Sequence, residues 1–506
     1  MDWKKLQNGS DIRGVAIDGI EGEKVNLDGN VAYLLGRAFL IWLGSNSPMA
    51  IKPLKIAIGR DPRITGNDLK KAISSGINAE SGKVYDAGIA STPAMFMSTQ
   101  FEEYGMNGAI MITASHLPFN RNGMKFFTPV GGLEKKDISA ILEIAEQLDN
   151  TSSSETRIEK IDLMDRYSTH LRDIISHGID PYKKNDLALK GFKIIVDAGN
   201  GSGGFFASKV LEPLGAEIQN SLFLEPDGMF PNHIPNPENS EAMQAITEAV
   251  IHHKADLGII FDTDVDRAAF VDHQGNPMNR NSLIALVSAI VLEKYPQSWI
   301  VTDSITSDGL NQFINLKLKG KHHRFKRGYR NVINEGISLD NNGKECHLAI
   351  ETSGHAAIKE NQWLDDGAYL AALILVKMAR MKIEGQGMLA DLIADLNIPL
   401  ESEEYRIKIL DENFKDRGLK ILHEIEAYSK KVEGWSIVPD NYEGIRVKCD
   451  KNHGDGWFLL RMSLHDPVMP LNIESESSGG VNFIQRKLID FINTQEGLDI
   501  SVLKNS

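Results

Sequence analysis

Three aspartates at alternate positions, Asp262, Asp264 and Asp266, follow directly on an apolar segment at residues 256–261. Their carboxylates can converge on one point, where each pair would repel by about 4 kcal/mol at a separation of about 4 Å and an effective dielectric of about 20. A hard cation with oxygen ligands relieves this repulsion, and Mg²⁺ suits a site with few protein ligands and a phosphate oxygen. The alternative is a solvated acidic turn. Arg267, the next residue, suits a phosphate or a sugar oxygen.

A serine loop lies upstream of the aspartates. Ser115 and His116 follow a short apolar segment at residues 107–112, and Lys125 lies a few positions further along. A hydroxyl at the carboxyl end of a strand, with a histidine and a lysine close by, could be a nucleophile that awaits activation. We expect the backbone to turn sharply at Pro118 and Gly123 and to lift the serine into the open. His116 is expected to be poorly placed as a base for its sequence neighbour. The alternative is an ordinary loop serine.

A third loop combines a carboxylate, a hydroxyl and an imidazole within five residues. Glu351, Ser353 and His355 follow an apolar strand at residues 348–350. Such a set can hold the vicinal hydroxyls of a sugar, with His355 available for proton transfer. The alternative is a turn that caps a helix beginning at Ala356.

Two further loops offer cationic side chains. Near the N-terminus, Asp11 and Arg13 are predicted to lie in a tight turn. Towards the C-terminus, Arg461 and Ser463 leave a predicted strand, and His465 follows. A guanidinium, a hydroxyl and a run of backbone amides could form a cradle for a phosphate. The alternative is an ordinary surface turn.

Two other interpretations of these motifs remain open. Residues 199–204 spell G-x-G-x-x-G after a strand, which is typical of a dinucleotide site, although no acidic residue follows clearly at the expected distance. A glycine-rich turn also permits close packing of a strand and a helix. Asp262 and Asp264 also fit the aspartyl-nucleophile pattern of phosphatases, in which Asp262 would carry the phosphoryl group. That motif would lie unusually late in the chain.

The elements around these loops alternate between strands and helices, which indicates an α/β fold with parallel or mixed sheets. Three α/β domains are expected at residues 1–160, 161–278 and 279–394, and a smaller α+β domain at residues 395–506. The candidate loops follow strands, and open α/β sheets bind ligands at the carboxyl ends of their strands. The joint inference is phosphoryl transfer on a phosphorylated sugar.

Composition narrows the class of protein. The chain has 506 residues, of which 42% are hydrophobic and 25% charged, and a formal net charge of −14. This acidic balance argues against general binding to nucleic acid or to an anionic membrane. Only two cysteines occur, which favours a reducing compartment without a disulfide framework. Since no signal core or spanning segment is evident, we expect a soluble, cytoplasmic protein.

Six short motifs resemble, in order, those of the α-D-phosphohexomutase superfamily, particularly its phosphomannomutase/phosphoglucomutase group. They are Asp11-Ile-Arg13-Gly14, Gly59-Arg60-Asp61-Pro62-Arg63, Thr113-Ala-Ser115-His116-x-Pro118, Asn122-Gly123-x-Lys125, Asp262-x-Asp264-x-Asp266-Arg267 and Glu351-x-Ser353-Gly354-His355. The likeness runs nearly end to end. It implies a four-domain architecture, with three α/β domains of mixed sheets and a C-terminal α+β domain around a central cleft.

The resemblance also implies a chemistry. Ser115 would be a phosphoserine, and Mg²⁺ would be held by that group and the three aspartates. The enzyme would interconvert hexose 1-phosphate and hexose 6-phosphate, of mannose or glucose, through a hexose 1,6-bisphosphate that also serves as activator. Arg13, Lys125 and His355 match positions of proton transfer or charge stabilisation. The positions that match contacts to the sugar or its phosphate are Glu351, Ser353, Arg461 and Ser463. Small-molecule sugar phosphates are therefore the expected partners, bound by a monomer or a homodimer.

Some positions depart from the family pattern. The last loop reads Ser463-Leu-His465-Asp-Pro where Ser-Asn-Thr-Glu-Pro is usual, and His465 could substitute for the missing groups. Arg330 could replace a phosphate-binding lysine. Thr352 favours mannose or glucose phosphates over glucosamine phosphate. Three alternatives remain: a phosphoglucosamine mutase, a phosphatase that acts through Asp262, and a non-catalytic protein of this fold that binds sugar phosphates.

Overall fold

The computed structural model describes residues 2–47, 51–149, 156–180, 187–463 and 466–504. His465, predicted to help hold a phosphate, lies outside the described residues. The chain forms two compact units: Met1–Leu283 with Ser353–Asp391, and Ile284–Thr352 with Leu392–Ser506.

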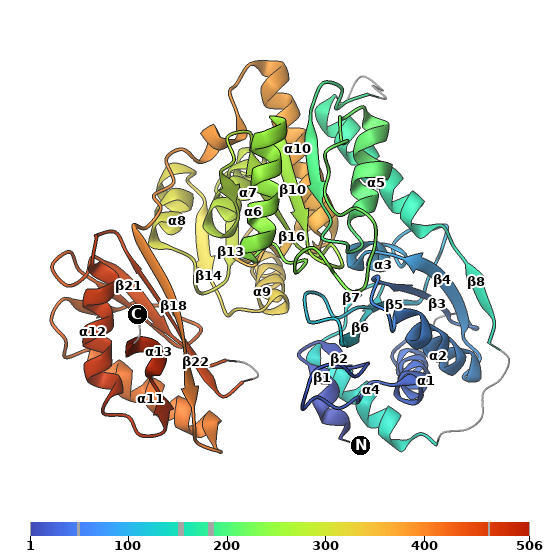
Figure 1. Ribbon diagram of the computed structural model, residues 1–506, viewed down its shortest axis with the longest axis horizontal. Coiled ribbons are helices and arrows are strands. Elements are labelled where there is room, and N and C mark those ends of the chain that lie inside the picture. The colour runs from blue at the N-terminus through green and yellow to red at the C-terminus, as the bar shows by residue number, and fades with distance from the viewer. Residues whose placement is uncertain (1, 48–50, 150–155, 181–186, 464–465, 505–506) are drawn as a thin grey trace. The chain divides into compact units, whose positions relative to one another are not determined.

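The first domain is built on a mixed sheet (Figure 1) whose strands run in the order β1-β2-β6-β5-β3-β4-β8, with β7 beside β6. Its strands are β1 (Gln7–Asn8), β2 (Asp11–Val15), β3 (Lys55–Arg60), β4 (Lys83–Ile89), β5 (Gly108–Ile112), β6 (Arg121–Thr128), β7 (Gly131–Gly132) and β8 (Ile158–Lys160). Its helices are η1 (Trp3–Leu6), α1 (Gly29–Asn46), α2 (Gly66–Ala79), α3 (Thr92–Met97) and α4 (Lys135–Gln147). Helices α1 and α2 touch backbone to backbone, because a Cβ at Gly76 would lie 2.1 Å from the carbonyl oxygen of Tyr33.

Strands β2 and β6 stand where the sequence predicted tight turns. Arg13 and Gly123 are cross-strand partners in an antiparallel pair. A Cβ at Gly123 would lie only 2.1 Å from the carbonyl oxygen of Ile12. The glycine is therefore needed for close approach of two strands and not for a turn. The prediction of a turn at Gly123 is wrong. The tight turn predicted near the N-terminus is confined to Gly9 and Ser10, so Asp11 and Arg13 lie on a strand instead.

The second domain carries the smaller sheet β12-β11-β10-β9, in which β9 and β10 are parallel and the other pairs antiparallel. Its elements are α5 (Leu163–Ile179), β9 (Ile194–Asp197), the π-helix η2 (Phe206–Leu211), η3 (Glu212–Leu214), α6 (Ser240–His253), β10 (Leu257–Phe261), β11 (Ala268–Asp272) and β12 (Pro277–Met278). The glycine-rich turn at residues 199–204 packs tightly here. A Cβ at Gly201 would lie 2.8 Å from the carbonyl oxygen of Thr263, so close packing accounts for this glycine without a dinucleotide.

A long loop at residues 225–238 is anchored to the second domain by a buried ion pair. His233 Nε2 lies 2.9 Å from Asp197 Oδ2, and its Nδ1 lies 3.0 Å from the carbonyl oxygen of Ile234. Burial alone would lower the pKa of His233, but the hydrogen bond to Asp197 raises it above its ordinary value. Both ring nitrogens face acceptors, which is the arrangement of an imidazolium.

The anchor predicts a pH-dependent stability. The contribution of a group with a raised pKa is fully present below the ordinary value of about 6.5 and is lost as the pH rises through the raised pKa. We expect His233→Asn to lower the free energy of unfolding by roughly 1–3 kcal/mol at pH 6. The variant should also lack the loss of stability that the wild type shows as the pH rises. Chemical denaturation of the wild type and the variant between pH 6 and pH 9 measures this pH dependence of stability. Parallel curves for the two proteins would contradict the assignment.

The remaining elements of the first unit are β16 (Ala356–Ile358), η5 (Lys359–Asn361), β17 (Leu364–Asp365) and α10 (Gly367–Glu384). Asp366 caps α10 by accepting from the backbone amide of Tyr369, at 2.9 Å. Its carboxylate also accepts from the hydroxyl of Tyr167 on α5, at 2.6 Å. Helix α10 is thereby tied to the start of the second domain.

The second unit holds a parallel array and an antiparallel sheet. Strands β13 (Trp299–Thr302), β14 (Lys321–Arg324) and β15 (Cys346–Ile350) are parallel, with β13 in the middle. The helices there are the end of α7 (Arg280–Lys294), α8 (Asp308–Gln312), the π-helix η4 (Phe313–Lys317) and α9 (Tyr329–Asn341). The connection to the last domain includes η6 (Leu389–Ile393).

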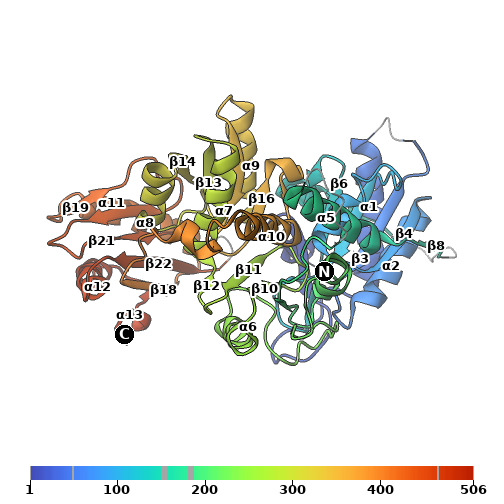
Figure 2. The ribbon, with the colours of Figure 1, turned by 90° about the horizontal axis from the view of Figure 1, so that it is seen from above.

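The last domain is an antiparallel sheet with helices packed on it (Figure 2). Its strands run in the order β19-β20-β21-β22-β18-β23. They are β18 (Glu401–Ile409), β19 (Trp435–Ile437), β20 (Ile445–Cys449), β21 (Gly456–Leu460), β22 (Val468–Ser475) and β23 (Leu498–Asp499), with α11 (Phe414–Ser429), α12 (Gly480–Ile492) and α13 (Ser501–Lys504). Alternate side chains of these strands meet α11 and α12 in one apolar core.

This order of elements confirms the predicted class of three α/β domains followed by an α+β domain. The predicted central cleft and the boundaries at residues 160, 278 and 394 stay predictions. Among the described residues, no helix combines the length and the apolar character needed to cross a bilayer.

Candidate functional site

The acidic loop at residues 262–267 connects two fully buried strands, β10 and β11. Asp262, Asp264 and Asp266 each offer a carboxylate oxygen, and these oxygens lie within 4.8 Å of one another. Val265 adopts a left-handed backbone with φ of +67°, which helps the loop to bring alternate side chains together. All three aspartates are buried, so the solvated-turn alternative does not describe this loop.

Two oxygens of this cluster fit a cation. Oδ1 of Asp264 and Oδ1 of Asp266 are buried, and neither has a hydrogen-bond partner among the described residues. Burial and the neighbouring Asp266 raise the pKa of Asp262 well above its ordinary value. Buried acceptors without donors are costly, and convergent carboxylate oxygens are what a hard divalent cation binds.

Lys125 partly neutralises the aspartates. It lies on β6, and its Nζ donates to Asp264 Oδ2 at 2.9 Å and to Asp266 Oδ2. Burial alone would lower the pKa of Lys125, but these two carboxylates raise it well above its ordinary value. The lysine is therefore a permanent cation that joins the first domain to the acidic loop of the second.

Ser115 points at the acidic loop. Its Oγ donates to Asp262 Oδ2 at 3.1 Å, and its backbone amide donates to Thr113 Oγ1 at 2.9 Å. The residue is 8% exposed and has a φ of +49°. The prediction that the serine is lifted into the open is wrong, because the second domain covers its loop.

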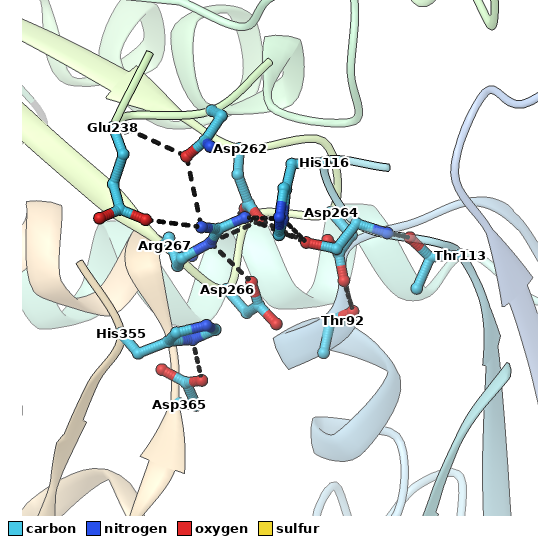
Figure 3. A network of polar contacts seen from close by, with 12 residues as sticks. Thr92, Thr113, His116, Glu238, Asp262, Asp264, Asp266, Arg267, His355 and Asp365 are labelled. Carbon is cyan, nitrogen blue, oxygen red and sulfur yellow. Dashed lines mark hydrogen bonds and ion pairs between the residues drawn. The ribbon is translucent and has the colours of Figure 1, made fainter. Parts of the chain in front are cut away.

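Arg267 lies beside His116 (Figure 3) and also contacts Ser115. Its Nη2 lies 3.2 Å from Ser115 Oγ and 2.6 Å from His116 Nδ1, and its Nε lies 3.1 Å from Asp262 Oδ2. This guanidinium is aimed at the place where a phosphoryl group on Ser115 would carry its charge.

His116 lies closer to the serine than the sequence predicted. Its Nδ1 is 3.3 Å from Ser115 Oγ, so the prediction of poor placement is wrong as to distance. Burial and the cation of Arg267 lower the pKa of His116 to about 3. The ring is therefore neutral, and its Nδ1 lone pair accepts from the guanidinium. His116 is for these reasons unsuited to act as the base for Ser115.

His355 is paired with a carboxylate beside the acidic loop (Figure 3). Its Nδ1 lies 2.5 Å from Asp365 Oδ2, and its backbone forms an isolated antiparallel bridge with Arg267. Burial alone would lower the pKa of His355, but Asp365 and Asp266 raise it to about 9. The ring is an imidazolium at neutral pH, and it can give a proton more readily than it can take one.

Arg13 borders the serine loop from β2. It donates to the carbonyl oxygen of Thr113, and its Nη2 forms a 2.9 Å ion pair with Asp11. The side chain of Arg13 is 10% exposed. The predicted Arg13, Ser115, Lys125, three aspartates, Arg267 and His355 thus come together in one unit.

Four residues of this site were not predicted. Thr92 donates to Asp264, Asp365 orients His355, and Asn236 and Glu238 lie against the guanidinium of Arg267. Asn236 Oδ1 accepts from Arg267 Nη1 at 3.3 Å, and Glu238 Oε2 lies 3.9 Å from the same nitrogen. Asp365 precedes an apolar helix in the sequence, but no local pattern links it to a histidine ten residues away.

The second unit carries most of the other predicted binding residues. Glu351 Oε1 accepts from the backbone amide of Gly328 at 2.7 Å. Arg461 Nη1 lies 3.7 Å from Glu443 Oε1, and Ser463 Oγ accepts from the amide of Asp466 at 3.3 Å. Arg330 lies in the first turn of α9. Ser353 is a buried residue of the first unit.

Comparison with known proteins identifies the family to which the chain belongs. Models of three domains match it in succession: phosphoglucomutase/phosphomannomutase alpha/beta/alpha domain I at residues 4–152, domain II at residues 165–275 and domain III at residues 279–396. The chain belongs to the phosphoglucomutase/phosphomannomutase family. This membership confirms the resemblance drawn from the six motifs.

Relatives within the phosphoglucomutase/phosphomannomutase family align over almost the whole chain. A phosphomannomutase/phosphoglucomutase of Pseudomonas syringae pv. tomato is 31% identical, over 94% of this chain and 92% of its own length. A phosphoglucosamine mutase of Caldicellulosiruptor saccharolyticus is 29% identical, over 93% and 95%. The crystal structure of a family protein from Burkholderia thailandensis has a TM-score of 0.77 at 25% identity and covers 98% of both chains.

Proposed function

We propose that this chain is a phosphohexomutase, an intramolecular phosphotransferase that interconverts hexose 1-phosphate and hexose 6-phosphate. The observation that carries the proposal is the meeting of Ser115 with three buried aspartates, two buried cations, Lys125 and Arg267, and the partly exposed imidazolium of His355. Mannose and glucose phosphates are the proposed substrates. The family names of its relatives support this assignment.

The proposed reaction uses Ser115 as a carrier of the phosphoryl group. The bond between phosphorus and Ser115 Oγ breaks, and a bond to a sugar hydroxyl oxygen forms, which yields a hexose 1,6-bisphosphate. The sugar hydroxyl gives up its proton in this step and the departing Ser115 Oγ gains one, so the serine hydroxyl is restored. The bisphosphate then returns its other phosphoryl group to the serine, and added bisphosphate would prime a chain that has lost its phosphoryl group.

The acidic loop is the proposed site of Mg²⁺. Asp262, Asp264 and Asp266 would hold the ion together with an oxygen of the phosphoserine. When bound, the cation supplies Lewis acidity and neutralises phosphoryl charge. Oδ1 of Asp264 and Oδ1 of Asp266, which accept no hydrogen bond from the described residues, support this assignment.

The cationic side chains have separate proposed roles. Arg267 and Arg13 would stabilise the charge that develops on the transferring group. Lys125 keeps the aspartates in place and adds positive charge beside the serine. His355, which Asp365 holds as an imidazolium, would give a proton to a departing oxygen.

The remaining predicted residues are proposed to bind the substrate. Glu351 and Ser353 would hold sugar hydroxyls, and Arg461, Ser463, Arg330 and His465 would hold the distal phosphate. The four domains are proposed to end near residues 160, 278, 394 and 506. Both cysteines, Cys346 and Cys449, are free and buried, which suits the proposed location in the reducing cytoplasm.

A coupled assay tests the function. Mannose 1-phosphate, glucose 1-phosphate and glucosamine 1-phosphate are each supplied with Mg²⁺ and a bisphosphate primer, and formation of the 6-phosphate is followed. We expect turnover of the mannose or glucose compound. Preference for glucosamine 1-phosphate would favour the alternative substrate class, and no isomerisation of any of the three would contradict the mutase proposal.

The metal site predicts a stabilisation that can be measured without substrate. At a Mg²⁺ concentration of about 100 times the dissociation constant, binding stabilises a folded protein by about 2.7 kcal/mol. We expect a matching rise in the melting temperature for the wild type and none for Asp264→Asn. Asp68→Asn is the control, because Asp68 is an exposed acid on α2. An equal rise in all three proteins would place the ion elsewhere.

A further inference from the structure

We propose that Arg63 is the positioning residue that holds the backbone of the Ser115 loop in the geometry for phosphoryl transfer. The proposal rests on the proposed function, since that loop carries the donor serine. Arg63 follows β3 in the turn that leads to α2. It is 1% exposed.

The guanidinium of Arg63 spans the whole serine loop through its carbonyl oxygens. Its Nη2 donates to the carbonyls of Ser115 at 2.5 Å and Leu117 at 2.6 Å, and its Nη1 donates to those of Pro118 at 2.7 Å and Arg121 at 3.0 Å. Only an arginine has five donors in one rigid plane. One side chain thus fixes four peptide groups of the loop.

A carboxylate ties Arg63 to the beginning of the same loop. Asp61 Oδ2 accepts from Arg63 Nε at 3.1 Å and from Thr113 Oγ1 at 2.7 Å. The same hydroxyl of Thr113 accepts from the amide of Ser115 at 2.9 Å. Both charged side chains are fully buried, and a buried ion pair is tolerated when its remaining donors and acceptors are satisfied.

The backbone of Ser115 needs such support. A residue with a side chain in the left-handed region costs about 1–2 kcal/mol, and Ser115 has a φ of +49°. Strained conformations of this kind persist only where their surroundings over-determine them. Here the strain aims Oγ at Asp262 and Arg267. Arg63 bonds the carbonyl of this very residue and so opposes its relaxation.

The loop at residues 225–238 closes the other side of Arg63. The guanidinium lies 5.2 Å from the centre of the Phe230 ring. A Cβ at Gly228 would lie 2.8 Å from Arg63 Cα. The arginine is therefore enclosed between the serine loop and a loop of the second domain that His233 anchors. This enclosure leaves it little room to move.

The test compares Arg63→Lys with Arg37→Lys. Lysine keeps the charge but cannot reach four carbonyls. Arg37 is a largely buried, ion-paired arginine of the same domain, bonded to Glu80 at 2.7 Å. Hydrogen–deuterium exchange of peptides from residues 113–121 reads the loop directly. We expect about tenfold faster exchange in Arg63→Lys, a kcat lowered about 100-fold and a KM within about threefold. Arg37→Lys should match the wild type in all three.

Several outcomes decide the proposal. Unchanged exchange and kcat in Arg63→Lys would overturn it, and so would a change in KM alone. If Arg63→Lys fails to fold, Thr113→Val is tested instead, since it removes only the hydroxyl that links Asp61 to the loop. This variant should exchange faster than the wild type and have a lower kcat, both to a smaller degree than Arg63→Lys. Wild-type exchange and kcat in Thr113→Val would overturn the proposal. Exchange is measured without substrate. Absent turnover in the wild type would therefore refute the proposed function while the loop data still decide the role of Arg63.

Discussion

Ser115→Ala is expected to lower mutase turnover at least about 10⁴-fold, because it removes the atom that carries the phosphoryl group. Stability should change by less than about 1 kcal/mol, since one neutral donor is lost and Asp262 keeps its bond to Arg267. The measurements are turnover in the coupled assay and mass-spectrometric detection of phosphoserine after incubation with a sugar bisphosphate. The variant should remain unphosphorylated.

Ser74→Ala is the matched control for the serine. Ser74 is buried in α2 of the same domain and donates within its own helix, so the change should leave turnover intact. The competing phosphatase interpretation makes the opposite prediction: phosphate release would survive Ser115→Ala and disappear in Asp262→Asn. Asp262 is poorly prepared for that role, because both of its oxygens already accept hydrogen bonds.

Lys125→Met is expected to damage both stability and activity. It leaves Asp264 and Asp266 buried without the ammonium that now bonds both, and breaking a buried ion pair costs roughly 3–5 kcal/mol. Turnover should fall about 100-fold or more, since a buried positive charge beside the serine is lost. Denaturation with and without Mg²⁺ should show that the cation restores part of the stability but not the turnover.

Lys70→Met separates the two effects of that substitution. Lys70 and Asp86 form another largely buried ion pair, at 2.6 Å, between α2 and β4. Its loss should cost stability and leave turnover unchanged. Wild-type turnover in Lys125→Met, or an equal loss of turnover in Lys70→Met, would contradict a specific role for Lys125.

The sequence predicted the acidic loop because its chemistry is local. Asp262, Asp264 and Asp266 alternate directly after a buried strand, so their convergence depends on little beyond the end of β10. In the C-terminal domain, the sequence likewise predicted the α+β class, which the sheet β18–β23 and its helices confirm. Local patterns sufficed wherever one element determines the arrangement.

Features that depend on distant segments were missed or wrong. The burial of Ser115 is due to the second domain, and the pairing of His355 with Asp365 is due to the adjacent strands β16 and β17. Gly123 was interpreted as a turn residue, although its lack of a side chain serves the approach of β2. Helix α8 continues as the π-helix η4, a change of hydrogen bonding that side-chain periodicity does not reveal.

Phosphorylation of Ser115 and occupancy of the proposed metal site are expected to be reciprocal, because Oδ1 of Asp264 and Oδ1 of Asp266 have no hydrogen-bond donor among the described residues. A phosphoryl group on Ser115 would bring up to two negative charges to a cluster that already contains these acids. The phosphorylated chain should therefore bind a divalent cation more tightly, and by thermodynamic linkage the cation must favour the phosphorylated chain by the same factor. The supply of the ion in the cell would then set the fraction of chains that stand ready for turnover.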